Sequence, residues 1–216
     1  MRKLIGCWVQ GVCLVLVAMA MAMAMPLAAA TNDTAAVDRL ERYFSAVERL
    51  TGDFEQVTRN EQGVVVERAG GAFAMARPQR FNWHYQTPWE QWIVSDGEQL
   101  WVHDVDLDQV VVRPLGDALG VGAAQLLSGN LAQLQRDFTI QTGTEDTVRL
   151  QPTDPAWSFQ TITVHFNGNV PDQLRIEDGM GQQIHVNLDN LQRNPVIDPA
   201  RFEFEPPAGV DVIRGS

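Results

Sequence analysis

Serine and histidine, the side chains that most often carry out nucleophilic and acid–base chemistry, are few in this sequence. None of the five serines belongs to a G-x-S-x-G motif, which presents a nucleophile on a sharp turn: Ser45, Ser95, Ser128, Ser158 and Ser216. The four histidines lie far apart and lack the H-E-x-x-H spacing of zinc enzymes: His84, His103, His165 and His185. The sequence therefore predicts no catalytic residues and no enzymatic activity.

Carboxylates are abundant, but no spacing marks a metal site or a catalytic pair. Asp104, Asp106 and Asp108 form a D-x-D-x-D run that lacks the glycine and the terminal glutamate of an EF-hand loop. We interpret this run as a solvated turn. A pair of carboxylates for hydrolysis has no distinguishing spacing either. We therefore expect neither a metal ion nor a cofactor.

The most distinctive stretch, RPQRFNWHYQTPWEQWIVSDGEQLW at residues 77–101, places an arginine ahead of a run of large aromatic rings. The rings are Phe81, Trp83, Tyr85, Trp89, Trp92 and Trp101. Rings at strand spacing usually belong to an ordinary core. Arg77 carries five N–H donors in a fixed fork, which could bind backbone carbonyls of a covering helix. The alternative interpretation is a solvated arginine at a strand end.

The elements that position these residues begin with an amphipathic helix. Apolar residues recur at intervals of three or four, with charged residues between them: Val37, Leu40, Phe44, Val47 and Leu50. Gly52 is expected to stop this helix. The pattern predicts a helix over residues 37–50.

After Gly52 the apolar period changes to two, and turn signals recur along the chain. Residues 81–85 and 162–166 show the alternation clearly, and Asp96-Gly97 is typical of a tight hairpin turn. This pattern predicts about eleven half-buried antiparallel strands. A sheet of that size must curl toward a barrel, with room for a ligand or an inserted helix.

One interruption of the strand pattern lies between residues 115 and 137. Its leucines, among them Leu126 and Leu127, suit one or two short helices near residues 121–134. This segment and the first helix are the available covers for the curled sheet. We expect the aromatic run to line the concave face beneath them.

Residues 1–30 have the pattern of a secretory signal peptide. Two basic residues precede a long uncharged apolar run, and Ala28 to Ala30 provide small residues for cleavage. A transmembrane anchor is the alternative. We expect cleavage near Ala30/Thr31, which leaves residues 31–216 as a single domain.

The expected mature chain is acidic and free of cysteine. Cys7 and Cys13 both fall within the predicted signal peptide, so no disulfide is expected, and export without disulfides suits a bacterial periplasm. Without Arg2 and Lys3, 14 basic residues face 27 acidic ones, which gives a net charge of −13. This charge argues against binding to nucleic acid or to an anionic membrane surface.

Taken together, these stretches resemble the periplasmic lipoprotein carrier family, LolA, over nearly all of residues 31–216. The most specific part is RPQRFNWHYQTPWEQWIVSDGEQLWVHDVDLDQVVV, which matches the family's Arg-Pro, Phe-x-Trp, Val-Ser-Asp-Gly and Leu-Trp patterns. Phe54-Glu55-Gln56 fits its early Phe-x-Gln. The ending DPARFEFEPPAGVDVI fits its closing pattern.

This resemblance implies an incomplete, open antiparallel β-barrel whose concave apolar face is covered by a helical lid. It implies a periplasmic carrier that binds the acyl chains of lipoproteins. An ATP-driven inner-membrane complex would release these lipoproteins to the carrier, which would deliver them to an outer-membrane receptor. We expect a monomer that does not bind nucleic acid.

The resemblance also implies particular site residues. The family's lid-holding arginine falls on Arg77, whose implied partners are backbone carbonyls near Phe44 and Leu127. The residues expected to form the acyl-chain cavity or the lid are Leu40, Phe44, Val47, Phe81, Trp83, Leu126 and Leu127. Phe44 stands where an aliphatic side chain is expected.

Two other binding proteins remain as alternatives. A periplasmic sensor or binding module of the same fold would take another lipid or hydrophobic ligand, but a sensor is expected to carry an additional domain, for which residues 31–216 leave little room. The outer-membrane receptor of the same pathway would need an acylated cysteine just after the signal peptide. Thr31 occupies that place.

Overall fold

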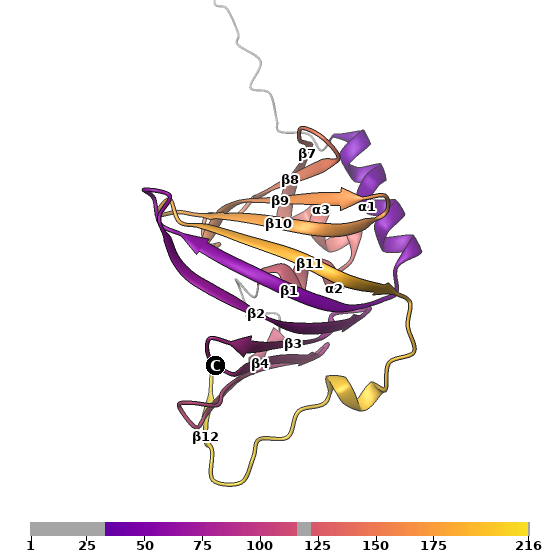
Figure 1. Ribbon diagram of the computed structural model, residues 1–216. Helices are drawn as coiled ribbons and strands as arrows, with labels where there is room; N and C mark the ends of the chain where they lie inside the picture. The colour runs from indigo at the N-terminus through magenta and orange to yellow at the C-terminus, as the bar shows by residue number, and fades with distance from the viewer. Residues whose placement is uncertain (1–32, 116–121, 216) are drawn as a thin grey trace, which may run out of the picture.

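The computed structural model of the protein describes residues 33–115 and 122–215, and the predicted signal peptide at residues 1–30 lies outside these ranges. Within them, twelve strands form one open sheet in the order β12-β6-β5-β4-β3-β2-β1-β11-β10-β9-β8-β7 (Figure 1). The strands are β1 (Arg49–Arg59), β2 (Val65–Ala76), β3 (Arg80–Thr87), β4 (Gln91–Asp96), β5 (Gln99–Asp104), β6 (Gln109–Pro114), β7 (Phe138–Thr142), β8 (Thr147–Pro152), β9 (Phe159–Asn167), β10 (Val170–Asp178), β11 (Gln183–Arg193) and β12 (Asp211–Arg214).

The predicted open, mainly antiparallel β fold is confirmed. Strands β1 to β11 pair with one another antiparallel, and the predicted turn at Asp96-Gly97 joins β4 to β5 with Gly97 at a φ of 103°. Strand β12 is an addition, because it pairs parallel with β6 at one edge of the sheet. Its four residues are too few to show an alternating pattern in the sequence.

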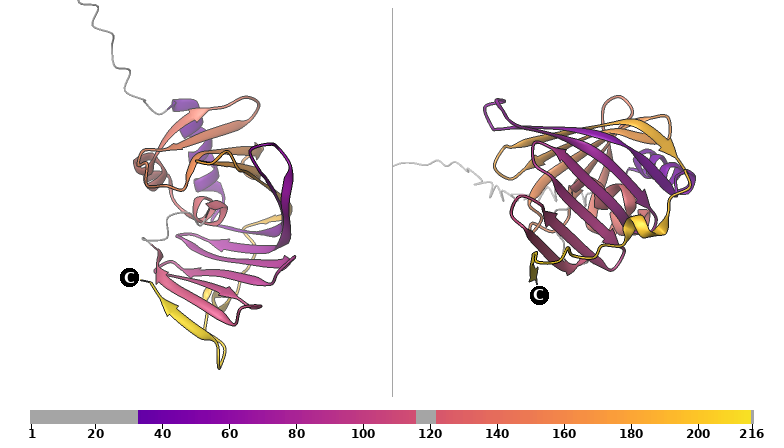
Figure 2. Two further views of the ribbon diagram at one scale, coloured as in Figure 1. Left: turned by 90° about the vertical axis from the view of Figure 1, so that its left-hand side faces the viewer. Right: turned by 60° about the horizontal axis from the view of Figure 1, so that its bottom comes forward.

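The sheet curves around helices on its concave side (Figure 2). These helices are α1 (Thr34–Ala46), α2 (Gly122–Ser128) and α3 (Leu131–Asp137), whereas the short 3-10 helix η2 (Pro199–Phe202) lies on the convex face. Helix α1 packs against β7, β8 and α3, whereas α2 packs against β2 and β3. The predicted helical segment near residues 121–134 thus divides into two helices. None of the helices described in the structure has the length and apolar character to cross a membrane.

Helix α1 begins and ends earlier in the chain than the predicted helix over residues 37–50. Asp33 caps its start by accepting a hydrogen bond from the amide of Ala35 at 2.9 Å, and its buried face includes Leu40 and Tyr43. The helix ends at Ala46 rather than at residue 50, since Val47 is extended and β1 begins at Arg49.

Gly52 lies inside β1 and does not stop the helix. The pairing of β1 with β11 changes register between Thr51 and Asp53. A Cβ atom on Gly52 would lie 2.7 Å from the carbonyl oxygen of Asp189 and 2.8 Å from a methyl group of Leu191. The glycine therefore allows a close approach of β11 at this irregularity.

The core fills the space between the concave face of the sheet and the helices. Its centre contains three aromatic rings, in which Trp83 lies 4.8 Å from Phe54 and 4.7 Å from Phe73, centroid to centroid. The α1 residues Leu40 and Tyr43 are buried in the same cluster. The helices α1, α2 and α3 thus cover the concave face at β2, β3, β7 and β8, and buried side chains fill the space between.

The prediction that the whole aromatic run lines the concave face is wrong for three of its rings. Alternation along β3 turns Trp83 inward and His84 outward, and Trp92 pairs with His84 across β3 and β4. The Trp92 ring stacks on His84 at 3.5 Å on the convex face. Trp101 also faces outward, 6.4 Å from the ring of Phe204, and Trp89 is 65% exposed in a turn.

The C-terminal segment after β11 covers part of this convex face before it reaches β12 (Figure 2). Phe202 is buried against Ala74 and Ala76 of β2. The side-chain amide of Asn82 donates to the carbonyl oxygen of Arg201 at 2.8 Å. The outward-facing rings therefore belong to the attachment of this segment and to the surface, and they do not face the lid.

Candidate functional site

Arg77 joins the turn between β2 and β3 to both parts of the lid. Its Nε donates to the carbonyl oxygen of Val47 at 2.7 Å, just after α1, and its Nη1 donates to the carbonyl oxygen of Gly129 at 2.5 Å, just after α2. Its backbone amide donates to the carbonyl oxygen of Glu48 at 2.9 Å. Arg77 thus connects the β2–β3 turn to the segments that follow α1 and α2.

Two aromatic residues of α1 lie beside this guanidinium. Its central carbon lies 4.7 Å from the ring centre of Tyr43 and 4.3 Å from that of Phe44, a distance at which a cation is attracted by a ring face. The Tyr43 hydroxyl donates to the carbonyl oxygen of Leu127 in α2 at 2.9 Å. Helices α1 and α2 are therefore also connected directly.

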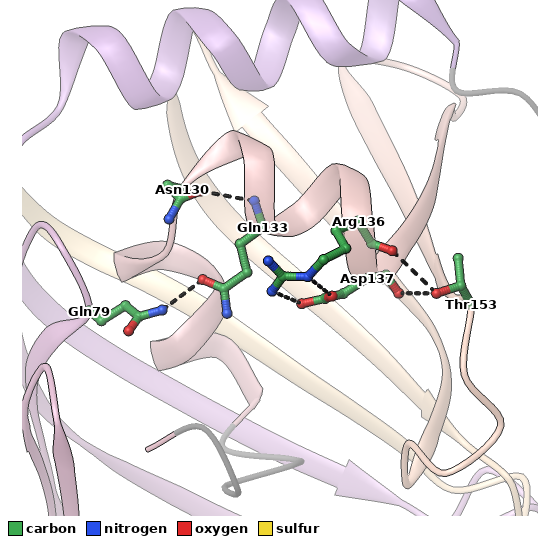
Figure 3. A network of polar contacts seen from close by, with 6 residues as sticks. All are labelled: Gln79, Asn130, Gln133, Arg136, Asp137 and Thr153. Atoms are coloured by element: carbon green, nitrogen blue, oxygen red, sulfur yellow. Dashed lines mark hydrogen bonds and ion pairs between the residues drawn. The ribbon is translucent and has the colours of Figure 1, made fainter. Parts of the chain in front are cut away.

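The turn that carries Arg77 makes two further contacts with the lid. The backbone amide of Gln79 donates to the carbonyl oxygen of Ser128 at 2.9 Å. Its side-chain amide donates to the Gln133 side chain of α3 at 2.7 Å (Figure 3). Asn130 caps the start of α3 by accepting from the Gln133 backbone amide at 2.9 Å. We call the contacts made by Arg77, Tyr43 and Gln79 the latch.

The far end of α3 is attached to the sheet as well. Thr153, just after β8, donates through its hydroxyl to the carbonyl oxygen of Asp137 at 3.1 Å, and its backbone amide donates to the same oxygen at 2.9 Å (Figure 3). Arg136 forms an ion pair with the Asp137 side chain at 2.8 Å. Helix α3 is therefore fixed at both ends, whereas the contacts described for α2 with the β2–β3 turn all belong to the latch.

Burial sets the protonation preferences within the latch. It raises the pKa of Tyr43 to about 12, although the nearby Arg77 charge acts in the opposite direction. Burial also lowers the pKa of Arg77, and its buried Nη2 finds no hydrogen-bond partner among the described residues. The phenol therefore remains protonated and can donate, while the guanidinium charge is incompletely compensated.

The acceptors of Arg77 differ slightly from those implied by the resemblance. The implied carbonyls were near Phe44 and Leu127, whereas the observed ones belong to Val47 and Gly129. Phe44 contacts the guanidinium through its ring, and the Leu127 carbonyl accepts from Tyr43.

The residues predicted to form the cavity or lid come together in one apolar cluster. Six of them are buried in it: Leu40, Val47, Phe81, Trp83, Leu126 and Leu127. Phe44 is half-buried and packs against the same cluster. Their place beneath and within the lid is thus described, while their role in binding stays a prediction.

A pocket of about 400 Å³ remains at the end of the sheet opposite the latch. Of the predicted residues, only Trp83 lines it. The other residues that line it include Gln56, Tyr85, Ala124, Met180 and Ile184. A much smaller space of about 20 Å³ lies beneath α2 and α3 and is lined by Leu126. The pocket is large enough for a small apolar ligand without any movement of the lid.

Sequence reasoning missed the polar contacts that three residues make in these two regions. Tyr43 follows Ala36 and Leu40 at helical spacing, a pattern that marks its buried face but not its hydrogen bond. Tyr85 shares the inward face of β3 with Trp83. Gln56 was seen only as part of the Phe-x-Gln pattern, because nothing local shows that its partner is the Tyr85 hydroxyl, at 3.1 Å.

Two of the histidines in the described residues lie next to carboxylates. His165 lies 2.5 Å from Asp172, and His84 lies 3.2 Å from Glu90. Within residues 33–115 and 122–215, no three His, Cys, Asp or Glu side chains gather in an arrangement that would hold a metal ion.

Comparison with known proteins agrees with this geometry. Residues 45–205 match the sequence profile of the family described as outer membrane lipoprotein carrier protein LolA. The outer-membrane lipoprotein carrier protein of Alkalilimnicola ehrlichii is 46% identical over 175 residues, which cover 81% of this chain and 82% of that protein. Its counterpart in Halorhodospira halophila is 44% identical over 188 residues, which cover 87% and 90%.

The fold is similar to that of a solved structure as well. The crystal structure of a LolA superfamily protein from Nitrosomonas europaea has a TM-score of 0.50 at 13% identity and covers 78% of this chain and 97% of that one. This likeness concerns the fold alone, whereas the sequence profile and the two relatives extend over most of the chain. The protein therefore belongs to the LolA family of outer membrane lipoprotein carrier proteins.

Proposed function

We propose that this protein is a periplasmic carrier that covers the acyl chains of lipoproteins between the inner and the outer membrane. The observation that carries this proposal is the latch over a concave apolar face, in which Arg77 bonds to the carbonyls of Val47 and Gly129. A lid that is held by a few polar contacts over an apolar interior suits a cavity that must open and close.

The energetics of acyl chains require such a cover. Each methylene removed from water contributes about 0.8 kcal/mol, so a diacylated lipoprotein does not cross an aqueous compartment unaided. Transfer from a bilayer to a protein interior exchanges one apolar environment for another, and the hydrophobic term nearly cancels. Release to a receptor is then feasible, and extraction from the inner membrane needs an external source of energy.

The latch is of a suitable strength for this exchange. Hydrogen bonds from a charged group contribute on the order of 1.5 to 3 kcal/mol. Against them stands the burial of the Arg77 charge, which lowers its pKa and leaves Nη2 without a partner among the described residues. The net stabilisation of the closed lid is therefore modest, and an entering acyl chain can displace it.

Helix α2 provides a physical connection between the pocket and the latch. Ala124 lines the pocket, while the carbonyls of Leu127 and Ser128 accept hydrogen bonds from Tyr43 and Gln79 one turn further along. A ligand that enters beside Ala124 and displaces α2 must break these bonds. We propose that loading enlarges the pocket in this way.

The proposed partners follow from the same role. An ATP-driven inner-membrane complex would supply the lipoproteins, and an outer-membrane receptor would accept them from a monomeric carrier. The predicted charge of −13 after residue 30 favours a basic surface on each partner and disfavours binding to anionic lipid. We propose no enzymatic activity.

The experiment that tests the function uses spheroplasts that retain lipoproteins in their inner membrane. The purified protein is added, and lipoproteins in the supernatant are identified by their co-elution with it. We expect energy-dependent release of a one-to-one complex. If a known carrier releases lipoproteins from the same spheroplasts and this protein does not, the proposal is contradicted.

The latch itself is tested by Arg77→Leu. This change removes bonds made only in the closed state, so the affinity for a fluorescent acyl probe should rise by about 10-fold to 100-fold, and transfer to the receptor should slow. Arg42→Leu removes the same charge from the exposed surface of α1 and serves as the control. Unchanged binding and transfer in Arg77→Leu would show that the latch does not control loading.

A further inference from the structure

The pocket at the end opposite the latch contains a polar pair within a largely apolar wall. The Tyr85 hydroxyl, on β3, donates to the side-chain oxygen of Gln56, on β1, at 3.1 Å. Both residues line the pocket together with Trp83, Ile93 and Ile184. Polar side chains in an apolar wall destabilise the protein unless their remaining hydrogen-bonding groups also find partners.

Gln56 has such a remaining group. With its oxygen occupied by Tyr85, its amide nitrogen still carries two hydrogens, and neither is donated to any residue that the structure describes. Gln56 is half-buried and lines the pocket, so a ligand that fills the pocket excludes water from this group. A purely hydrocarbon ligand would displace that water and offer no acceptor in return.

Ser158, Asp178 and Gln182 are the other polar residues that line the pocket, and Asp178 is already engaged. Asp178 accepts hydrogen bonds from the backbone amides of Met180 at 2.8 Å and Gln182 at 2.7 Å, which fixes the β10–β11 turn. Ser158 is exposed and Gln182 belongs to the β10–β11 turn, so the Gln56 amide is an available donor on the wall of the pocket formed by β1 and β3. Burial, together with the charge of Glu67, raises the pKa of Tyr85 to about 12, so its hydroxyl remains a donor to Gln56.

The position of the pair matches the chemistry of a fatty acyl ester. Met180, which is 83% exposed, marks the open side of the pocket, and Trp83 and Ala124 lie at its inner side. A chain that enters from the open side places its hydrocarbon toward Trp83 and leaves its carbonyl nearer the mouth. An ester carbonyl accepts hydrogen bonds but cannot donate them, which is what the Gln56 amide requires.

We propose that Gln56, oriented by Tyr85, binds an ester carbonyl of the diacylglyceryl group and so makes this pocket selective for acyl esters over plain hydrocarbon chains. This inference rests on the proposed function, because it assumes that the ligand is an acylated lipid. It adds a polar specificity-determining contact to a site whose other interactions are apolar.

The test compares two lipids that differ only in their carbonyl groups. Dioctanoylglycerol and its dioctyl ether analogue are titrated against the full chain, and displacement of a fluorescent fatty acid reports binding. We expect the wild-type protein to bind the ester about 3-fold to 10-fold more tightly than the ether, the range that corresponds to one hydrogen bond. In Gln56→Leu this ratio should fall to about one through weaker ester binding, while ether binding is retained.

Two further variants and one control support this comparison. Tyr85→Phe leaves Gln56 in place without its orienting partner, so the ratio should fall partway. Gln56→Glu replaces the donor with a carboxylate and should also abolish the ester preference. It provides the same test if Gln56→Leu does not fold. Gln192→Leu, which changes an exposed glutamine of β11, should keep the wild-type ratio.

The outcomes separate the two proposals. Equal binding of ester and ether by the wild-type protein, or an ester preference that persists in both Gln56 variants, would overturn the assigned contact while acyl binding itself stands. Failure of both lipids to displace the fluorescent fatty acid from the wild-type protein would overturn this inference together with the proposed carrier function.

Discussion

The two ends of the curved sheet are built from different interactions. At the latch end, Arg77 and Tyr43 connect the β2–β3 turn, α1 and α2 through hydrogen bonds to backbone carbonyls. At the other end, the β10–β11 turn leaves a pocket of about 400 Å³ next to the exposed Met180. Polar contacts of modest strength thus hold the end that moves in the proposed mechanism, and mostly apolar side chains line the pocket at the other end.

Helix α2 relates these two ends to each other. Within this helix, Ala124 lines the pocket and the Ser128 carbonyl accepts a hydrogen bond in the latch. Strands such as β1 also extend between the two ends, and in the proposed loading step α2 shifts relative to this sheet. The following changes test whether the two ends differ as described, and they run from the largest expected effect to the smallest.

Removal of the ring between the two ends should have the largest effect on stability. Trp83→Ala deletes a side chain packed between Phe54 and Phe73, and we expect a loss of about 3 to 5 kcal/mol in the free energy of unfolding. Urea denaturation measures this loss. Trp92→Ala, on the convex face, is the matched control and should cost clearly less, so equal losses would contradict the assignment of these rings to different faces.

The latch end should show a dependence on alkaline pH that Tyr43→Phe removes. Burial raises the pKa of Tyr43 from 10.0 to about 12, so its contribution is fully present below pH 10 and is lost as the pH rises toward 12. The wild-type protein should therefore lose about 2 to 3 kcal/mol more than Tyr43→Phe over this range. Below pH 10 the variant lacks only the bond to Leu127, worth about 1 kcal/mol.

Denaturation of both proteins at a series of pH values provides this measurement. Tyr85→Phe gives the comparison with the pocket end, where the hydroxyl is less completely buried and the effect should be smaller. Parallel pH profiles of the wild-type protein and Tyr43→Phe would contradict the burial of the Tyr43 hydroxyl in the latch.

The connection from α1 to β1, beside the latch, depends on Asn194. Its side-chain oxygen accepts from the amides of Glu48 and Arg49 at 2.9 and 3.1 Å, and its nitrogen donates to the carbonyl of Ala46 at 3.0 Å. Asn194→Ala should cost about 1 to 2 kcal/mol, because it removes these bonds and places alanine at a φ of 54°. Asn194→Gly separates the two causes, and thermal unfolding of both variants should show the smaller loss for glycine.

The smallest effect is expected at the start of α3. Asn130→Ala removes the side chain that accepts from the Gln133 amide and should destabilise the protein by about 1 kcal/mol. Asn130→Ser retains a capping oxygen and should recover most of this loss in chemical denaturation. No difference between the two variants would show that the cap is unimportant for the lid.

Much of the fold could be predicted from periodicity. The alternation in residues 81–85 and 162–166 marks strands that face an apolar core, and the turn at Gly97 follows from its sequence. The end of α1 could not be predicted in this way. Val47 and Leu50 continue the helical spacing by chance, but Val47 is extended and Leu50 belongs to β1. Gly52 similarly serves a close contact with β11 that no local pattern contains.

The candidate site was predictable in part. Arg77 and the apolar positions of the lid and sheet could be named because the resemblance to a family adds information that spacing does not. The Tyr43 and Gln56 contacts join residues far apart in the chain, 84 positions for Tyr43 and Leu127 and 29 for Gln56 and Tyr85. Such pairs depend on how the sheet curves, and a single sequence does not reveal that curvature.

The most direct test of the connection between the two ends is residue-resolved amide hydrogen exchange, with and without a diacylated lipopeptide. The Gln79 amide donates to Ser128 at the end of α2, whereas the Arg77 amide donates to Glu48 beside β1 and serves as an internal control. We predict that loading accelerates exchange at Gln79 and leaves Arg77 unchanged. Unchanged exchange at both amides in a fully loaded protein would contradict the account, because α2 would then remain latched while the ligand is bound.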